Sequence, residues 1–193
     1  RSIDFQLKAI VNPVTSERQE IMTSWKDLAV DLMGTFSFGR ELGRHHEVRD
    51  LTDATVEGLS TADERMSAIY DLVQNRISWN DRQTFLLGRS LDEVLESGTG
   101  TSAEINMLLC SMLQEADVDA YPVLISTRGH GMMSPSFPFT RQFNEVIVAV
   151  KDDGDYTFLD ATSKHRPAGM LPPRALNGQG WLVDTKSPTW LRI

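Results

Sequence analysis

A glycine-rich turn that runs directly into a long apolar stretch most constrains what this chain can fold into. Residues 98–104 read Gly-Thr-Gly-Thr-Ser-Ala-Glu, and residues 105–113 continue as Ile-Asn-Met-Leu-Leu-Cys-Ser-Met-Leu. Thr101 and Glu104 have the spacing of a capping box, so we predict a helix that begins directly after Thr101. The amino end of a helix carries unpaired N–H groups and a partial positive charge, and Ser102 stands at this end.

Helical patterns come first in the chain and strand patterns come second. Capping boxes open at Thr61 and Ser90, in addition to the one at Thr101. Alternating or continuously apolar runs then predict strands over residues 121–126, 143–150, 156–159 and 181–184. The turn at residues 152–155 joins two of these strands as a hairpin. This order predicts an α+β fold, in which N-terminal helices and a central helix pack on an antiparallel sheet.

The chain divides into a short leading segment and one domain. Residues 1–20 read as the tail of a preceding strand region followed by a polar linker, and residues 21–193 read as a single domain. Within that domain, helical spacing begins near Thr23, whereas the polar residues 37–54 are expected to be irregular. The first residue is Arg1 rather than Met, so we interpret the chain as a piece of a longer protein.

Composition narrows the class of protein. The 193 residues are 40% hydrophobic and 24% charged, with a formal net charge of −8, as in an ordinary soluble globular domain. The acidic balance argues against a nucleic-acid partner, and no apolar run is long enough for a membrane span. The single cysteine, Cys110, lies in the middle of the predicted helix, where we expect it to be a small buried side chain rather than a nucleophile.

Three segments together resemble the transglutaminase-like core of the papain-like cysteine enzymes, over roughly residues 60–185. The segments are the Gly-x-Ser-x-Glu turn at residues 100–104, Phe-Asn-Glu at residues 143–145 and Leu-Asp-Ala-Thr at residues 159–162. A family member reads Gly-x-Cys-x-Asp, Phe-Asn-His and Leu-Asp-Pro-Thr at these places. The resemblance therefore implies that Ser102, Glu145 and Asp160 occupy the catalytic Cys, His and Asp positions.

Two of the three catalytic side chains have accordingly changed, which implies a degenerate member of the family. A serine hydroxyl needs an adjacent base to remove its proton, whereas a cysteine ionises at a helix start. Glu145 is a weaker base than histidine near neutral pH, because its ordinary pKa lies about two units lower. Asp160 has no histidine left to orient, and we expect it to cap the turn into Ala161. The alternative for Ser102 is a purely structural role at the first turn of the helix.

The remaining histidines offer weaker candidates. His130 lies in a long loop and His165 follows Asp160, so either is a possible substitute base for Ser102. His45 and His46 form an adjacent pair without a third ligand at helical spacing, so we predict no metal site there. No cofactor motif is present.

We therefore expect a catalytically degenerate binding or scaffolding module within a larger bacterial protein. By resemblance, its ligand is an extended peptide or a glycopeptide, and the flanking domains of the parent chain are its partners. Such cores often follow a β-rich domain in bacterial envelope proteins, which implies a periplasmic or secreted location. The alternative is an active serine amidase or peptidase with Ser102 as its nucleophile, and a third possibility is a structural spacer with a filled cleft.

Overall fold

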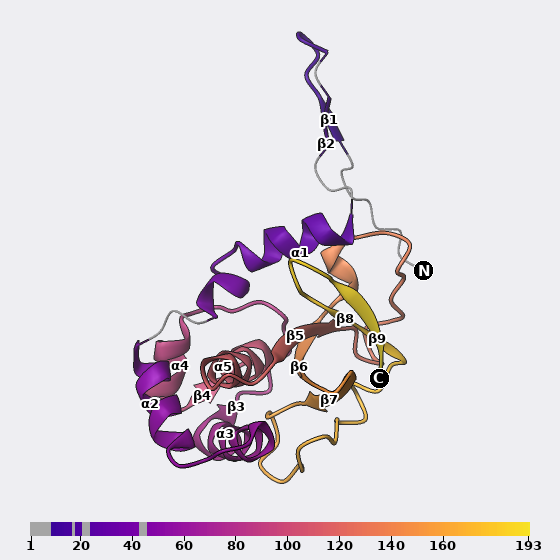
Figure 1. The fold of residues 1–193 in the computed structure, drawn as a ribbon. Helices are drawn as coiled ribbons and strands as arrows, with labels where there is room; N and C mark the ends of the chain where they lie inside the picture. The colour runs from indigo at the N-terminus through magenta and orange to yellow at the C-terminus, as the bar shows by residue number, and fades with distance from the viewer. Residues whose placement is uncertain (1–8, 17, 21–23, 43–45) are drawn as a thin grey trace.

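The computed structural model describes residues 9–16, 18–20, 24–42 and 46–193, and the account below is restricted to them. The main body combines helices with a five-stranded antiparallel sheet of order β7-β6-β5-β8-β9 (Figure 1). The helices are α1 (Trp25–Met33), α2 (His46–Val56), α3 (Ala62–Arg76), α4 (Leu91–Ser97) and α5 (Ser102–Glu115), with 3₁₀ turns η1 (Gly39–Glu41) and η2 (Thr140–Gln142). The sheet strands are β5 (Ala120–Ile125), β6 (Glu145–Asp152), β7 (Asp155–Leu159), β8 (Gln179–Leu182) and β9 (Thr189–Arg192). The α+β prediction is confirmed.

Helix α5 is the centre of the fold. Its N-cap is Thr101, whose hydroxyl accepts from the Glu104 amide while the Glu104 carboxylate accepts from the Thr101 amide, as the capping-box spacing predicts. Every residue from Ser102 to Leu113 is buried, so the helix is enclosed on all sides rather than amphipathic. Cys110 is among these buried side chains, as predicted.

The sheet has two apolar faces because alternate side chains of each strand point in opposite directions. On β6, Val146 and Val148 belong to the main core, which also contains α5. Ile147 and Ala149 belong to a second, smaller core on the opposite face. Leu171 and Ala175 complete this second core, so the long connection between β7 and β8 covers the face of the sheet away from α5.

Smaller elements differ from the sequence expectation in two places. Residues 37–54 were expected to be irregular, but α2 begins at His46, because Val48 and Thr52 fall on one helical face and are buried. A short parallel pair, β3 (Ser78–Trp79) with β4 (Thr99–Gly100), joins the end of α3 to the start of α5. Glycine and a single apolar residue give no alternation there, so sequence patterns do not predict this pair.

An antiparallel hairpin stands away from the main body at the N-terminal end (Figure 1). It pairs β1 (Ala9–Val11) with β2 (Arg18–Glu20), within the segment that we expected to be a strand tail and linker. The first part of that segment, residues 1–8, lies outside the described residues. The boundary between this segment and the domain at residue 21 stays a prediction.

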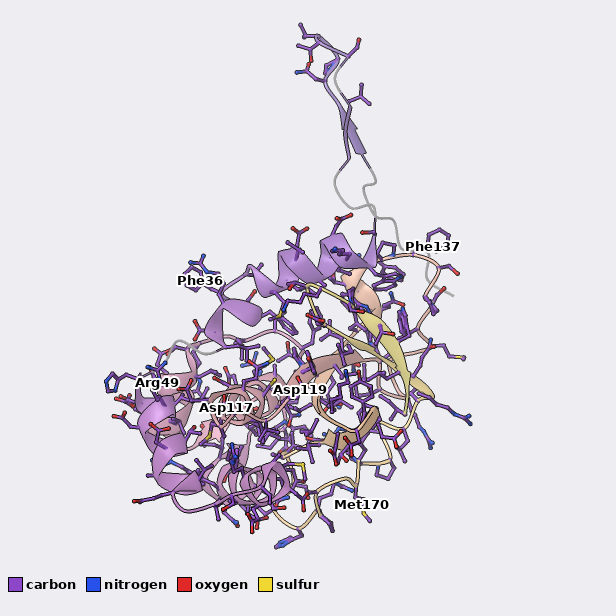
Figure 2. The ribbon with its side chains drawn as sticks, viewed as in Figure 1. Phe36, Arg49, Asp117, Asp119, Phe137 and Met170 are labelled. Atoms are coloured by element: carbon purple, nitrogen blue, oxygen red, sulfur yellow. The ribbon has the colours of Figure 1, made fainter. Side chains whose placement is uncertain are left out.

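Large exposed apolar side chains are scattered over the surface. Phe36, Phe137 and Met170 lie at three separate places on the outline of the molecule (Figure 2). Isolated exposed apolar residues are ordinary on a protein surface. None of these three therefore extends the candidate site described below.

Candidate functional site

Ser102 is fully buried at the first turn of α5, and its hydroxyl is engaged on both sides by one neighbouring residue. The hydroxyl donates to the Thr84 carbonyl at 3.0 Å and accepts from the Thr84 amide, also at 3.0 Å. The Ser102 amide donates to the Arg82 carbonyl at 3.0 Å. Ser102 thus fastens the segment that precedes α4 to the start of α5, and its proton is directed at a carbonyl rather than at a base.

Glu145 begins β6 and is completely buried. Its carboxylate accepts from Arg174 through both Nη2, at 2.8 Å, and Nε, at 3.2 and 3.3 Å. Gln83 donates to the second oxygen at 3.2 Å. Burial raises the pKa of Glu145, while the Arg174 guanidinium opposes that shift by stabilising the charged form.

Asp160 follows β7 and is also completely buried. One carboxylate oxygen accepts from Arg174 Nη2 at 3.0 Å, and the other accepts from Asn106 Nδ2 and from the Thr162 amide, each at 3.1 Å. The bond to Thr162 is the turn cap expected from the sequence. Asp160 is therefore held by α5, by its own turn and by Arg174.

Arg174 joins the two carboxylates, and sequence reasoning missed it. It comes from the loop that covers the second face of the sheet, where Pro172 and Pro173 precede it without any motif. The Arg174 guanidinium also donates to Thr162 Oγ1 at 3.0 Å and lies 4.9 Å from the centre of the Trp79 ring. Burial disfavours the charge of Arg174, but Glu145 and Asp160 outweigh it and raise its pKa. The available signal was indirect: two carboxylates that converge inside a protein require a cation.

The predicted site residues are brought together to different degrees. Glu145 and Asp160 share the Arg174 guanidinium directly. Ser102 is connected to them through two consecutive residues, because Thr84 bonds Ser102 while Gln83 bonds Glu145. No hydrogen bond between described residues joins the Ser102 hydroxyl to a titratable side chain.

The family model of the transglutaminase-like superfamily matches residues 49–164. This span is more than half of the chain and contains α5 and the β6–β7 hairpin. The chain belongs to the transglutaminase-like superfamily. The resemblance seen in the sequence is thereby confirmed at the level of the family, and the matched span includes Ser102, Glu145 and Asp160.

The solved structures to which this transglutaminase-like chain is similar are longer than the chain. It is similar to a candidate protease from Parabacteroides distasonis, with a TM-score of 0.64 and 18% identity over 99% of this chain and 35% of that one. A candidate cysteine protease from Cytophaga hutchinsonii has a TM-score of 0.44 and 12% identity over 69% of this chain and 42% of that one. The chain thus spans about a third of the length of the first structure. No curated protein matches it.

Among the described residues, no hydrogen bond joins a histidine to the Ser102 hydroxyl, whose partner is Thr84. His130 is exposed, and its Nε2 lies 3.1 Å from the Arg141 carbonyl. His165 is exposed, while His46 forms an ion pair with Asp50 on the surface of α2. His45 lies outside the described residues.

The described residues contain neither a candidate metal site nor a candidate membrane-spanning helix. No group of three or more His, Cys, Asp or Glu side chains within that part of the chain is arranged to hold a metal ion. Among the helices that the structure describes, none combines the length and hydropathy that a membrane span requires.

Proposed function

We propose that this transglutaminase-like chain is a non-catalytic module that serves binding or scaffolding in a larger bacterial protein. The observation that carries the proposal is the engagement of Ser102 by Thr84. A serine nucleophile needs a base that accepts its proton at the moment of attack. The Ser102 proton instead points at a backbone carbonyl, in a position that solvent does not reach.

The state of Glu145 supports the same proposal. A general base needs a free lone pair within hydrogen-bond reach of the proton that it abstracts. Both oxygens of Glu145 already accept from Arg174, and one accepts from Gln83 as well. Proton uptake by Glu145 would leave the half-buried Arg174 guanidinium with one charged carboxylate fewer, which is costly.

The ligand of the module is proposed by resemblance alone. A groove inherited from a transglutaminase-like ancestor would suit an extended peptide or a glycopeptide, and the flanking domains of the parent protein would be its partners. A role in a periplasmic or secreted protein belongs to the same proposal, as does the domain boundary near residue 21.

A labelling experiment separates this function from the serine amidase alternative. The chain is treated with a fluorophosphonate probe, which phosphorylates activated serines, and is assayed on amide and ester substrates beside Ser102→Ala. We expect no labelling at Ser102 and identical background turnover for the two proteins. Turnover that Ser102→Ala abolishes would overturn the proposal and identify a serine hydrolase. Ser187→Ala, at an exposed position, controls for incidental effects of serine removal.

A further inference from the structure

We infer that the cluster around Glu145 and Asp160 is a guanidinium-binding site, which Arg174 of the same chain occupies. The inference rests on the proposed non-catalytic function, because it assigns to both carboxylates a binding role instead of a catalytic one. It names a chemical class of ligand for the site and identifies the group that now fills it.

The first argument is the number and placement of the acceptors. Glu145 and Asp160 are both completely buried, and both direct carboxylate oxygens at a single guanidinium. Thr162 adds a neutral oxygen at 3.0 Å from Nη2. A planar guanidinium presents N–H groups in fixed directions, so it can serve several acceptors at once. Asp160 and Thr162 both lie on Nη2, so the contact of Glu145 with both Nε and Nη2 is what distinguishes a guanidinium from an ammonium, which has a single nitrogen.

The second argument is the aromatic wall. The Arg174 guanidinium carbon lies 4.9 Å from the centre of the Trp79 ring, which is within the range of a cation–π contact. Trp79 packs against the main core and is positioned by the β3–β4 pair. A flat cation fits between this ring and the two carboxylates, whereas a neutral side chain would leave those carboxylates buried without a counter-charge.

The third argument is that the backbone of the loop that carries Arg174 is held by contacts other than the guanidinium. Its loop is fixed independently of the guanidinium, because the Arg128 amide donates to the Arg174 carbonyl and Ala175 is buried in the second core. Asn177 holds the same loop by donating to the Ser126 and Gly131 carbonyls. The backbone around Glu145 and Asp160 therefore keeps its course without the Arg174 side chain. Removal of that side chain is expected to leave a site of defined shape.

The test is chemical rescue of Arg174→Ala. We expect this variant to melt roughly 10 °C below the wild-type protein, because two buried carboxylates lose their cation. Methylguanidine should then raise its melting temperature in a saturable way, as a ligand that binds only the folded state does. Methylammonium, which has the same charge, should give less than about a tenth of that gain. The wild-type protein should respond to neither compound, since its site is filled.

Matched variants locate the effect. Arg49→Ala removes another arginine that pairs with a carboxylate, Glu115, and should show no methylguanidine-dependent gain. Glu145→Gln combined with Arg174→Ala should abolish the rescue, since the amide keeps the shape and loses the charge. Equal stabilisation by methylammonium, or the same gain in Arg49→Ala, would overturn the inference. These melting temperatures do not depend on turnover. Catalytic activity at Ser102 would therefore contradict the proposed function, while the methylguanidine experiment would still test the guanidinium site.

A second measurement applies to the intact protein if Arg174→Ala does not fold. Nuclear magnetic resonance should resolve a protected Nε–H signal for Arg174, assigned by its absence in Arg174→Lys. Its exchange with solvent should accelerate at least about tenfold in Glu145→Gln, because the acceptor of that proton is weakened. A freely rotating and rapidly exchanging guanidinium in the wild-type protein would overturn the inference.

Discussion

The Asn106 side-chain amide ties the middle of α5 to the end of β7 by donating to Asp160 Oδ1 at 3.1 Å. The same amide donates to the Val146 carbonyl at 2.9 Å, and its oxygen accepts from the Ala161 amide at 3.0 Å. Asn106 is completely buried, so each of these bonds replaces one that water would make in the unfolded chain. One side chain therefore satisfies a strand carbonyl, a turn amide and a buried carboxylate.

Asn106→Ala should lower the free energy of unfolding by about 2–4 kcal/mol, since it leaves several buried polar groups without partners. Urea unfolding measures the change. Asn75→Ala is the matched control, because Asn75 is exposed and its side chain donates to the Asp71 carbonyl within α3, and it should stay within about 0.5 kcal/mol of the wild type. Equal behaviour of the two variants would contradict the structural role of Asn106.

Ser102→Ala should be folded and less stable than the wild-type protein by about 1–2 kcal/mol, because the amide and carbonyl of Thr84 lose their partner. Urea unfolding provides the measurement, with Ser187→Ala as reference. A more stable Ser102→Ala protein would indicate that the serine is retained at a cost to folding, as expected of a residue kept for chemistry.

Cys110 should resist thiol reagents in the native protein. Its side chain is completely buried in α5, and burial alone raises the pKa of the thiol far above its ordinary value. Ellman's reagent should label less than a few per cent of the protein in buffer, and label it fully in urea. Rapid labelling without denaturant would mean that α5 opens locally far more often than its enclosure indicates.

The capping box at the start of α3 should make stability depend on pH. Hydrogen bonds from Thr61 and Ser60 lower the pKa of Glu64 below its ordinary value. A carboxylate with a lowered folded-state pKa contributes stability above its unfolded pKa, near about 4.3, and loses that contribution as pH falls through the folded value. Glu64→Gln should therefore melt below the wild type at pH 7, and the gap should close at lower pH. A gap that stays equally wide at pH 7 and at low pH would contradict this role of the Glu64 carboxylate.

Helix caps and turns were predicted from the sequence because each depends on residues only a few positions apart. Capping boxes at Thr61, Ser90 and Thr101 each open a helix at the predicted residue. The turn at Asp153 and Gly154, both with positive φ, joins β6 to β7 as predicted. Strand β9 was not predicted, since its four residues are half-exposed or exposed and give no clear period.

The sequence indicated which positions form the candidate site. It did not indicate which residues pair with the buried carboxylates there. The positions of Ser102, Glu145 and Asp160 follow from a pattern spread over the transglutaminase-like core. Their interactions depend on Thr84 and Arg174, which meet them through long-range packing that no local pattern encodes. Glu145 is completely buried, whereas a strand-end carboxylate alone suggests partial exposure; the difference comes from the loop that carries Arg174 across it.

The covering loop between β7 and β8 also bears on how such a site changes over evolutionary time. Leu171 and Ala175 belong to a core, and Arg174 stands between them on the carboxylates. A mutation that placed histidine at position 145 would meet a guanidinium already paired with Asp160. A mutation that removed Arg174 first would leave the buried carboxylates of Glu145 and Asp160 without their cation. Each of these single substitutions is thus penalised by folding, so the pairing of Arg174 with the two carboxylates opposes stepwise change at this site.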